Sequence, residues 1–367
     1  MKIICLKNHL KEVLNICEKI SGKNLSLPAL SNVLIEGDIR NLKFTATNLE
    51  IGVEISIPAK VEKKGKVAVP ANILNNFISN LASDENIELE SQNNNLLIST
   101  KNSSTLIKGQ PFDDFPILPK IDGKKEFELP ASDFINGLKS VWYASSFSNI
   151  KPEISSIYIN SGKNNPLTFA ATDSFRLAEK KFKYSCNDLN GILIPFRSTA
   201  EILRIFENKE GKIKIFFDKN QFFIIFEGIK FITRLTEGNF PDYQQIIPKK
   251  FVTDVIIDKN KFSSALKTAS IFSGKLYELN IIIGRDDGVI TLQTSSAETG
   301  EHTTNIQAKI TGEELKMSFN YKYILDCLQH INSPEIILRF SGEGKPLLIS
   351  GTNDNSFLYL AMPMSGM

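Results

Sequence analysis

Few of the side chains that usually carry out chemistry occur in this chain, and they form no recognisable catalytic set. The 367 residues include three histidines, His9, His302 and His330, and no Gly-x-Ser-x-Gly, His-Glu-x-x-His or Gly-x-Gly-x-x-Gly pattern. His9 and His330 lie in helical segments at the edges of apolar stripes, where a structural role is more common than a catalytic one. No second acid stands at a fixed spacing from Asp173 or Glu50, so paired-carboxylate acid–base catalysis has no candidate. We therefore predict a protein that is not an enzyme.

One glycine-containing segment, Gly342-Glu-Gly344-Lys345-Pro346, has a faint likeness to a phosphate-binding loop. A glycine at the required earlier position is missing, and Pro346 stands where Ser or Thr would hold the metal. The segment also connects the strand-like run 336–340 to another strand. It is therefore predicted to be a hairpin turn rather than a nucleotide site.

The composition and the cysteines favour a reducing cytoplasm. The chain is 42% hydrophobic and 23% charged, which is ordinary for a globular protein. It contains no run of about 18 apolar residues, and the segment 1–7 is too short for a signal peptide. The four cysteines form no close pair, which predicts neither a zinc site nor a disulfide framework: Cys5, Cys17, Cys186 and Cys327. We expect no metal and no cofactor.

A sequence block that occurs three times organises the chain. Residues 169–177 contain Ala-Ala-Thr-Asp-Ser-Phe-Arg-Leu, and related blocks stand at 44–50 and 292–298. The segment Asn239-Phe-Pro-Asp-Tyr is likewise echoed by Asp114-Phe-Pro. A period of about 120 residues is far above the range of roughly 20–50 residues typical of solenoids, so the repeats are whole domains. We predict three domains, 1–122, 123–250 and 251–367.

The same order of elements is predicted in each third of the chain. A short strand is followed by an amphipathic helix, in which Leu10, Val13, Leu14 and Cys17 share one face in the first third. Runs of period-two alternation then predict strands, a second helix follows, and three more strands close the unit. The predicted fold is α+β, with three tandem copies of a βαβββαβββ unit.

Charge differs among the thirds although the net charge of the whole chain is only +2. The first third carries 14 basic and 14 acidic residues, the middle third 19 and 14, and the last third 10 and 13. The middle third is therefore the basic one, but solvated turns are the simpler explanation of its Lys180-Lys181 and Lys249-Lys250 pairs.

This order, with the Ala-Thr-Asp-Ser-x-Arg-Leu-Ala block, the Asn-Phe-Pro-Asp-Tyr block and the terminal Met362-Pro363-Met364, resembles the bacterial DNA polymerase III β subunit, the DNA sliding clamp. The resemblance covers the whole chain. It implies two protomers joined head to tail in a ring of six similar domains, with helices lining the hole and sheets forming the outer wall. It also implies a homodimer, threaded on double-stranded DNA, that tethers the polymerase III α subunit, the clamp loader and other proteins with clamp-binding motifs.

A clamp must hold DNA without reading its sequence, so it needs basic side chains that face phosphates. The helical segments offer such a set, although lysines also occupy the solvent face of any amphipathic helix. The candidate DNA-facing residues are Lys7, Lys11, Lys19, Lys23, Lys139, Arg197, Arg204, Lys259, Lys261, Lys267 and Lys322.

The resemblance also implies a pocket for partner peptides between the middle and last domains. Flexible methionines suit a surface that accepts several partners, and Arg176 would orient the peptide by hydrogen bonds. The matching positions are Ile154, Thr172, Arg176, Leu177, Pro241, Ile246, Leu360, Met362, Pro363 and Met364. Without the resemblance, the same methionines and Leu177 would be assigned to an ordinary core. The chain departs from some family members at Ser174, Phe175, Gln245 and its tail, Ser365-Gly366-Met367, which predicts a more apolar rim.

The third implied site is the ring interface. It would place an edge strand containing Thr105 and Ile107 against the first helix of the last domain, at Ile271 and Phe272. An exposed sheet edge beside an apolar pair is a liability that ring closure would remove. A scaffold of tandem domains that binds only protein is the rival interpretation, and it would not need to form a ring.

Overall fold

The structure is a computed structural model, and it describes residues 1–22, 27–81, 86–121, 125–148, 150–162, 165–186, 189–284 and 288–364. The chain divides into two compact units, Met1–Ser132 with Arg204–Leu235, and Asp133–Leu203 with Thr236–Met367. The predicted middle domain, 123–250, contributes to both units. The two units are therefore described separately, and the three domain boundaries stay a prediction.

The first unit contains two sheets, in which neighbouring strands run antiparallel. The first sheet has five strands in the order β5 (Lys60–Lys63), β1 (Lys2–Leu6), β7 (Asn86–Gln92), β8 (Asn95–Ser99) and β9 (Ser104–Ile107). The second has eight strands in the order β10 (Lys125–Pro130), β15 (Lys212–Phe217), β16 (Gln221–Phe226), β17 (Ile229–Arg234), β4 (Ile51–Pro58), β3 (Asn41–Thr47), β2 (Asn32–Asp38) and β6 (Gly65–Pro70).

The second unit also contains two antiparallel sheets. Nine strands run in the order β14 (Leu189–Pro195), β11 (Ser156–Gly162), β12 (Asn165–Thr172), β13 (Arg176–Phe182), β26 (Phe357–Ala361), β25 (Leu347–Gly351), β24 (Glu335–Phe340), β18 (Thr253–Asp258) and β22 (Lys309–Gly312). Four more run in the order β21 (Gly300–Gln307), β20 (Val289–Ser296), β19 (Glu278–Ile283) and β23 (Leu315–Asn320).

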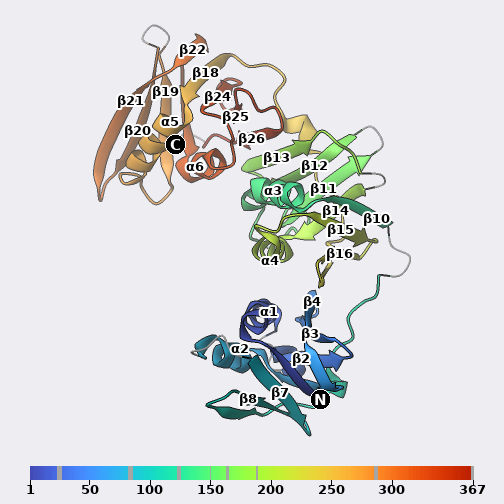
Figure 1. Cartoon of the computed structure of the whole chain (residues 1–367). Helices are drawn as coiled ribbons and strands as arrows, with labels where there is room; N and C mark the ends of the chain where they lie inside the picture. The colour runs from blue at the N-terminus through green and yellow to red at the C-terminus, as the bar shows by residue number, and fades with distance from the viewer. Residues whose placement is uncertain are drawn as a thin grey trace. The chain divides into compact units, whose positions relative to one another are not determined.

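Six α-helices lie among these sheets in the described ranges: α1 (Lys7–Ile20), α2 (Ala71–Asn80), α3 (Ala131–Val141), α4 (Phe196–Phe206), α5 (Lys259–Ser270) and α6 (Tyr321–Leu328). The predicted apolar face of α1 is buried at Leu10, Val13, Leu14 and Cys17. Helices α1 and α2 lie side by side, as do α5 and α6 (Figure 1). Hydrophobic spacing therefore predicted the buried face of α1 correctly.

Short 3₁₀ turns connect some elements: η1 (Pro28–Ser31), η2 (Phe112–Asp114), η3 (Trp142–Ala144) and η4 (Tyr243–Ile246). The segment Gly342–Pro346 is a hairpin turn, as predicted, because β24 and β25 pair antiparallel on either side of it. A second hairpin joins β15 and β16, which pair antiparallel. Its turn is held by the Asp218 carboxylate, which accepts hydrogen bonds from the amides of Asn220 (2.8 Å) and Gln221 (2.7 Å).

Each third has more strands than the predicted βαβββαβββ order. The additional strands precede the second helix: β5 and β6 in the first third, β14 in the middle third, and β22 and β23 in the last. Strand β14 was missed because its residues Ile192, Leu193 and Ile194 are all buried, so the segment shows no polar–apolar alternation. Strand β6 shows no alternation either, because Val67, Ala68 and Val69 are all buried.

Candidate partner-binding site

The turn between β12 and β13 is the centre of the predicted peptide pocket, and its own side chains hold it. The Thr172 hydroxyl donates to the carbonyl of Arg176 (2.6 Å). The Asp173 carboxylate accepts from the backbone amides of Phe175 and Arg176, both at 2.9 Å. Ser174 has a positive φ of 79°, which a residue other than glycine adopts only at an energetic cost. The turn consequently presents Phe175, 62% exposed, at its tip.

The first third contains the same turn, which explains the repeated sequence block. There the Thr47 hydroxyl donates to the carbonyl of Ile51 (2.8 Å), and the Asn48 side chain accepts from the amides of Glu50 and Ile51. Leu49 takes the positive φ, at 75°. The Thr-Asp or Thr-Asn pair is therefore a turn-forming device in both copies. The copies share only the threonine, and at the last position of the turn Ile51 of the first copy corresponds to Arg176 of the second.

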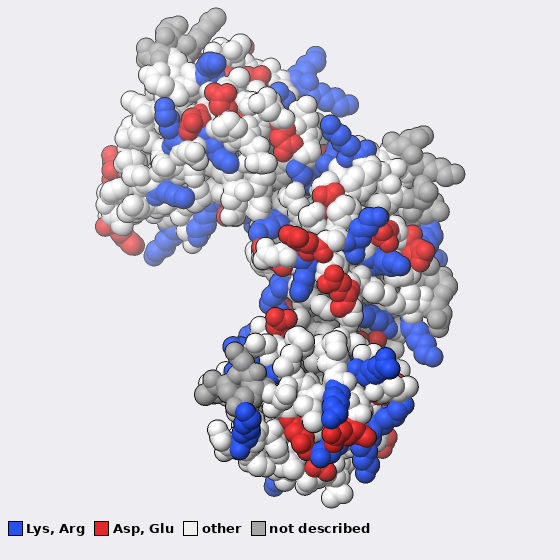
Figure 2. All heavy atoms as spheres, viewed as in Figure 1, with Lys and Arg blue, Asp and Glu red and all other residues white. Residues whose placement is uncertain are grey.

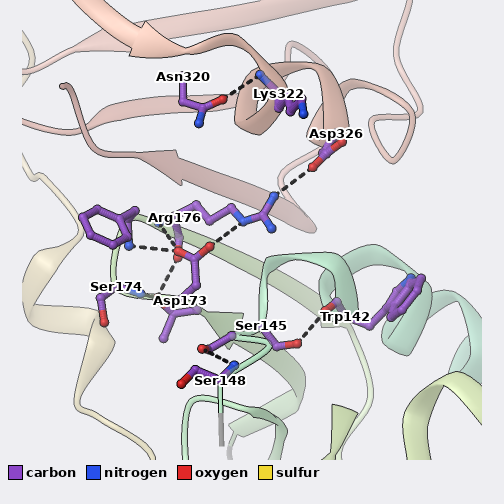
Figure 3. A network of polar contacts seen from close by, with 12 residues as sticks. Trp142, Ser145, Ser148, Asp173, Ser174, Arg176, Asn320, Lys322 and Asp326 are labelled. Atoms are coloured by element: carbon purple, nitrogen blue, oxygen red, sulfur yellow. Dashed lines mark hydrogen bonds and ion pairs between the residues drawn. The ribbon is translucent and has the colours of Figure 1, made fainter. Parts of the chain in front are cut away.

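Arg176 connects this turn to helix α6. Its side chain is 7% exposed, and its Nε atom donates to Asp173 Oδ2 (2.9 Å) while Nη1 donates to Asp326 Oδ2 (2.8 Å). Figure 3 shows the side chain extending from its turn toward Asp326 on α6. Burial alone would lower the pKa of the guanidinium, but Tyr359, Asp173 and Asp326 together raise it. Two of its donors are therefore committed within the protein, and hydrogen bonding of Arg176 to a partner peptide stays a prediction.

Aromatic rings surround this ion pair. The Arg176 guanidinium carbon lies 4.5 Å from the centroid of the Tyr323 ring and 5.9 Å from that of Tyr143. Tyr143 stacks in turn on His330, with ring centroids 4.6 Å apart and an interplanar angle of 8°. Burial, helped by the charge of Lys139, lowers the pKa of His330 to about 4. The imidazole is therefore neutral at pH 7 and packs as a ring.

The residues that follow β26 form one wall of the site. Strand β26 pairs with β13, so that Leu360 lies opposite Leu177. Beyond the strand, the amide of Met362 donates to the carbonyl of Phe175, and that of Met364 donates to the carbonyl of Ser318, both at 2.8 Å. The half-buried segment Met362-Pro363-Met364 thus lies between the turn and β23. The predicted tail residues 365–367 lie outside the described part of the chain.

The remaining predicted pocket residues divide into a core and a rim. Leu177 and Leu360 are buried in a cluster with Ala170, Tyr243 and Leu348, so they form the floor beneath the site rather than an open wall. Ile154 and Thr172 are also buried, whereas Pro241 and Ile246 are exposed at the rim.

A groove of about 570 Å³ lies on the neighbouring sheet face. Its lining includes Tyr158, Asn160, Thr168 and Phe240, and Pro241 is the one predicted pocket residue that also lines it.

Comparison with known proteins identifies the family. Three family models of the DNA polymerase III beta subunit match the chain in order. The N-terminal domain matches residues 1–119, the central domain 128–242 and the C-terminal domain 244–365. The chain belongs to the DNA polymerase III beta subunit family. The predicted resemblance is confirmed along the whole chain, and so is the three-domain clamp fold.

Individual relatives agree with this assignment. The beta sliding clamp of Synechococcus elongatus is 26% identical over 374 residues and covers 99% of both chains, and that of Staphylococcus aureus is 27% identical over 361 residues, covering 96% of both. The solved sliding clamp of Bacillus subtilis has a TM-score of 0.94 at 26% identity and covers 100% of both chains. The Pseudomonas aeruginosa β subunit, at 22% identity and a TM-score of 0.94, shows the same fold.

Two of the basic residues proposed to face DNA in this family member have internal partners instead. Lys7, at the start of α1, is buried, and its ammonium donates to the carbonyl of Leu81 just beyond α2 (2.6 Å). Lys259, at the start of α5, donates to the carbonyl of Ile331 just beyond α6 (2.7 Å). Each lysine ties the first helix of its repeat to the end of the second. Both ammonium groups therefore donate to carbonyls of the protein itself.

The other predicted cations are placed differently. Lys322 is exposed, with its ammonium 3.4 Å from the centroid of the Tyr277 ring. Lys23 lies outside the described residues. The rest are exposed on helices: Lys11, Lys19, Lys139, Arg197, Arg204, Lys261 and Lys267.

The predicted interface residues also require one correction. Strand β9 is an edge strand, but Ile107 is buried within its own unit, because it points toward the core side of the sheet. Its neighbour Leu106 is 51% exposed and is the apolar side chain that this edge offers. Ile271 is 66% exposed, whereas Phe272 is half-buried and stacks on His302 of β21 at 5.5 Å.

Sequence reasoning missed the side chains that receive Arg176. Asp326 and Tyr323 are three residues apart on α6 and so share one face of that helix. An acid and a tyrosine on one helical face do not indicate that their partner is an arginine 150 positions earlier in the sequence. Among the described residues, no group of three or more His, Cys, Asp or Glu is placed to hold a metal ion. Within the same part of the chain, helices that are both long and apolar enough to cross a membrane are absent.

Proposed function

We propose that this chain is a DNA sliding clamp, in which two copies close head to tail into a ring that encircles duplex DNA. Helices would line the hole and sheets would form the outside. The observation that carries the proposal is the match of all three repeats, in order and over nearly the whole chain, to the beta sliding clamp family. A ring of repeated domains acts by topology, so it can hold DNA without a tight contact to any base.

The charge distribution supports loose, sequence-independent contact with DNA. Lys and Arg are interspersed with Asp and Glu over the visible face, without a large patch of one sign (Figure 2). Scattered cations on the helices, such as Lys11, Arg197 and Lys267, can contact phosphates through screened, weak interactions. A protein that slides requires such weak contacts, because a tight specific complex would stop it.

The site around Arg176 is the proposed docking point for partners, including the polymerase III α subunit, the clamp loader and other proteins with a clamp-binding motif. The half-buried Met362 and Met364 border it, and the exposed Phe175 and Ile246 extend its apolar rim. Flexible thioethers beside a rigid turn allow peptides of somewhat different shape to bind the same place.

The ring would close where the edge strand β9 of one protomer meets the region of Ile271 in the other. Leu106 and Ile271 are large apolar side chains that are more than half exposed in the single chain. Phe272 lies against His302 of β21, which is itself an edge strand. Pairing two sheet edges would cover both, and two copies would close with twofold symmetry.

In this role the chain would act as a processivity factor without catalytic residues of its own, in the bacterial cytoplasm where the replication machinery works. It would need neither a cofactor nor a metal.

Ring closure on DNA provides the decisive test. The purified protein is sized by light scattering, loaded by a clamp loader onto nicked circular DNA, and filtered at high salt before and after the circle is linearised. A clamp elutes as a dimer, stays with the circle and is lost from the linear form. A monomer, or equal retention on both forms, would support a tandem-domain scaffold that binds only protein.

A further inference from the structure

An exposed aromatic cluster lies at the junction of α3, η3 and α4 in the second unit. Trp142 stacks on Phe196, with ring centroids 5.1 Å apart and planes 23° apart. Phe147 contacts the same Phe196 edge to face, with centroids 4.7 Å apart at 75°. The Phe147 side chain is 71% exposed, and Trp142 and Phe196 are half-buried. These three rings, here called the Trp142 cluster, form a surface on which a flat ring can stack.

Hydrogen bonds hold the segment that carries Phe147. The amide of Ser146 donates to the carbonyl of Ile154 (2.9 Å), and the amide of Ser148 donates to the hydroxyl of Ser146 (3.1 Å). The hydroxyl of Ser155 donates to the carbonyl of Ser148, and the amide of Phe196 donates to the carbonyl of Ser155 (3.0 Å). The base of the loop is therefore tied to the first residue of α4. The exposed side chain of Phe147 is therefore carried by a segment that these hydrogen bonds hold in place.

The charged residues next to the cluster in the chain are mostly basic. Lys139 precedes Trp142 by three residues, Lys151 follows Phe147 by four, and Arg197 is the neighbour of Phe196; all three are exposed. The nearest carboxylates in the chain, Glu153 and Glu201, are half-buried. An aromatic surface with exposed cations close by in the chain is a combination found where single-stranded nucleic acid binds, since bases stack and phosphates need positive charge.

We propose that the Trp142 cluster stacks on unpaired bases of single-stranded DNA. The proposal rests on the proposed clamp function and adds to it a second mode of DNA contact. Duplex DNA presents phosphates and base edges, and the faces of its bases are covered by their neighbours. The exposed ring of Phe147 therefore finds a flat partner only where bases are unstacked, as they are beside a primer end.

Trp142 reports on this contact directly, because it is the only tryptophan of the chain. Stacking of a base in its vicinity quenches indole fluorescence. The intact protein is titrated at low salt with three hairpins of equal duplex length: one blunt, one with an oligothymidine overhang, and one with an abasic overhang that keeps the phosphates. We expect quenching with the oligothymidine overhang and little with the other two. Equal quenching by the abasic and thymidine overhangs would overturn the proposal.

Substitutions at Phe147 separate stacking from a general apolar contact. Phe147→Tyr keeps an aromatic ring and should keep the affinity for the overhang. Phe147→Leu keeps an apolar side chain without a ring and should weaken binding roughly five-fold or more, since a stacked base contributes about 1–3 kcal/mol. Phe112→Ser, at another exposed phenylalanine, is the matched control and should change nothing. Leucine and tyrosine variants that behave alike would assign the cluster to a protein partner and refute stacking on DNA.

Retention on nicked circular DNA keeps this proposal distinct from the clamp proposal. Phe147→Leu should be retained as the unmodified protein is, because ring closure does not involve Phe147. Loss of retention by the unmodified protein would refute the clamp, whereas loss of overhang discrimination alone would refute only the stacking site.

Discussion

Arg176 and Asp326 form an ion pair, with Nη1 and Oδ2 2.8 Å apart, between the turn that precedes β13 and helix α6. The arginine is nearly buried and also bonds Asp173, so the pair ties the floor of the candidate partner site to the last repeat. A charge-assisted bond to a buried guanidinium is among the stronger polar contacts in a protein.

Asp326→Asn should weaken binding of a partner peptide, because Arg176 and its turn would lose their anchor on α6. We expect a loss of affinity of several-fold, and a decrease in the free energy of unfolding of about 1–3 kcal/mol. Fluorescence polarisation with a labelled polymerase-derived peptide measures the first, and urea denaturation the second. Glu343→Gln, in the β24–β25 hairpin, is the matched control. Unchanged affinity in Asp326→Asn would separate the ion pair from the partner site.

Removal of residues 362–367 should abolish peptide binding without affecting dimerisation. The deletion begins after β26, so the pairing of that strand with β13 and β25 is kept. It removes the wall formed by Met362, Pro363 and Met364, and a small site of this type loses most of its affinity with its central contacts. Polarisation and light scattering provide the two measurements. Undiminished peptide binding would place the partner site elsewhere.

Leu106→Ser combined with Ile271→Ser should convert the dimer to a monomer at micromolar concentration. Both side chains are mostly exposed in the single chain, so the substitutions leave its core intact. Each truncated apolar anchor costs on the order of 1–2 kcal/mol of association free energy, or roughly ten-fold in the dissociation constant. Light scattering over a dilution series measures the shift. Ile117→Ser, at another exposed isoleucine, is the control and should remain dimeric.

His330 should make the protein less stable in mild acid. Its pKa is about 4 in the folded protein and 6.5 in the unfolded chain, so the unfolded chain binds the additional proton between these values. The stability associated with the neutral imidazole is therefore complete above pH 6.5 and is lost as the pH falls toward 4. His330→Phe keeps the stacking on Tyr143 and should flatten the decline, as urea denaturation at pH 7, 6 and 5 would show. An identical decline in the variant would assign it to other groups.

Lys7→Met and Lys259→Met should each destabilise the protein, because each leaves a backbone carbonyl without its ammonium partner. We expect a loss of about 1–3 kcal/mol for each, the cost of removing a charge-assisted hydrogen bond. Lys11→Met and Lys261→Met, at exposed positions on the same helices, are the controls. Urea denaturation should show these losses for Lys7→Met and Lys259→Met, whereas the two controls should keep the stability of the unmodified protein. Equal losses in the controls would contradict the role given to the two internal hydrogen bonds.

Local patterns in the sequence accounted for much of the fold, since helix α1 could be placed from the spacing of Leu10, Val13, Leu14 and Cys17. The Thr172-Asp173 block could be recognised as a repeat. The structure shows that its residues form a turn whose hydrogen bonds all lie within five residues. Contacts between segments that are distant in the sequence could not be predicted from local patterns. Nothing near Lys7 indicates that its ammonium bonds the carbonyl of Leu81, and the Trp142 cluster forms only when a loop and the start of α4 meet.

The pairing of β13 with β26 has a consequence for the synthesis of the chain on the ribosome. Residues 176–182 emerge long before residues 357–361, and the nine-stranded sheet cannot close between its two halves until the later strand arrives. During that interval the apolar edge at Leu177 and Ala178 has no strand beside it. Pairing across such a sequence separation is slow, and the waiting edge is prone to association with other nascent chains. The rate of translation through the last repeat, and the chaperones present meanwhile, would thus influence how much of this protein reaches its native state.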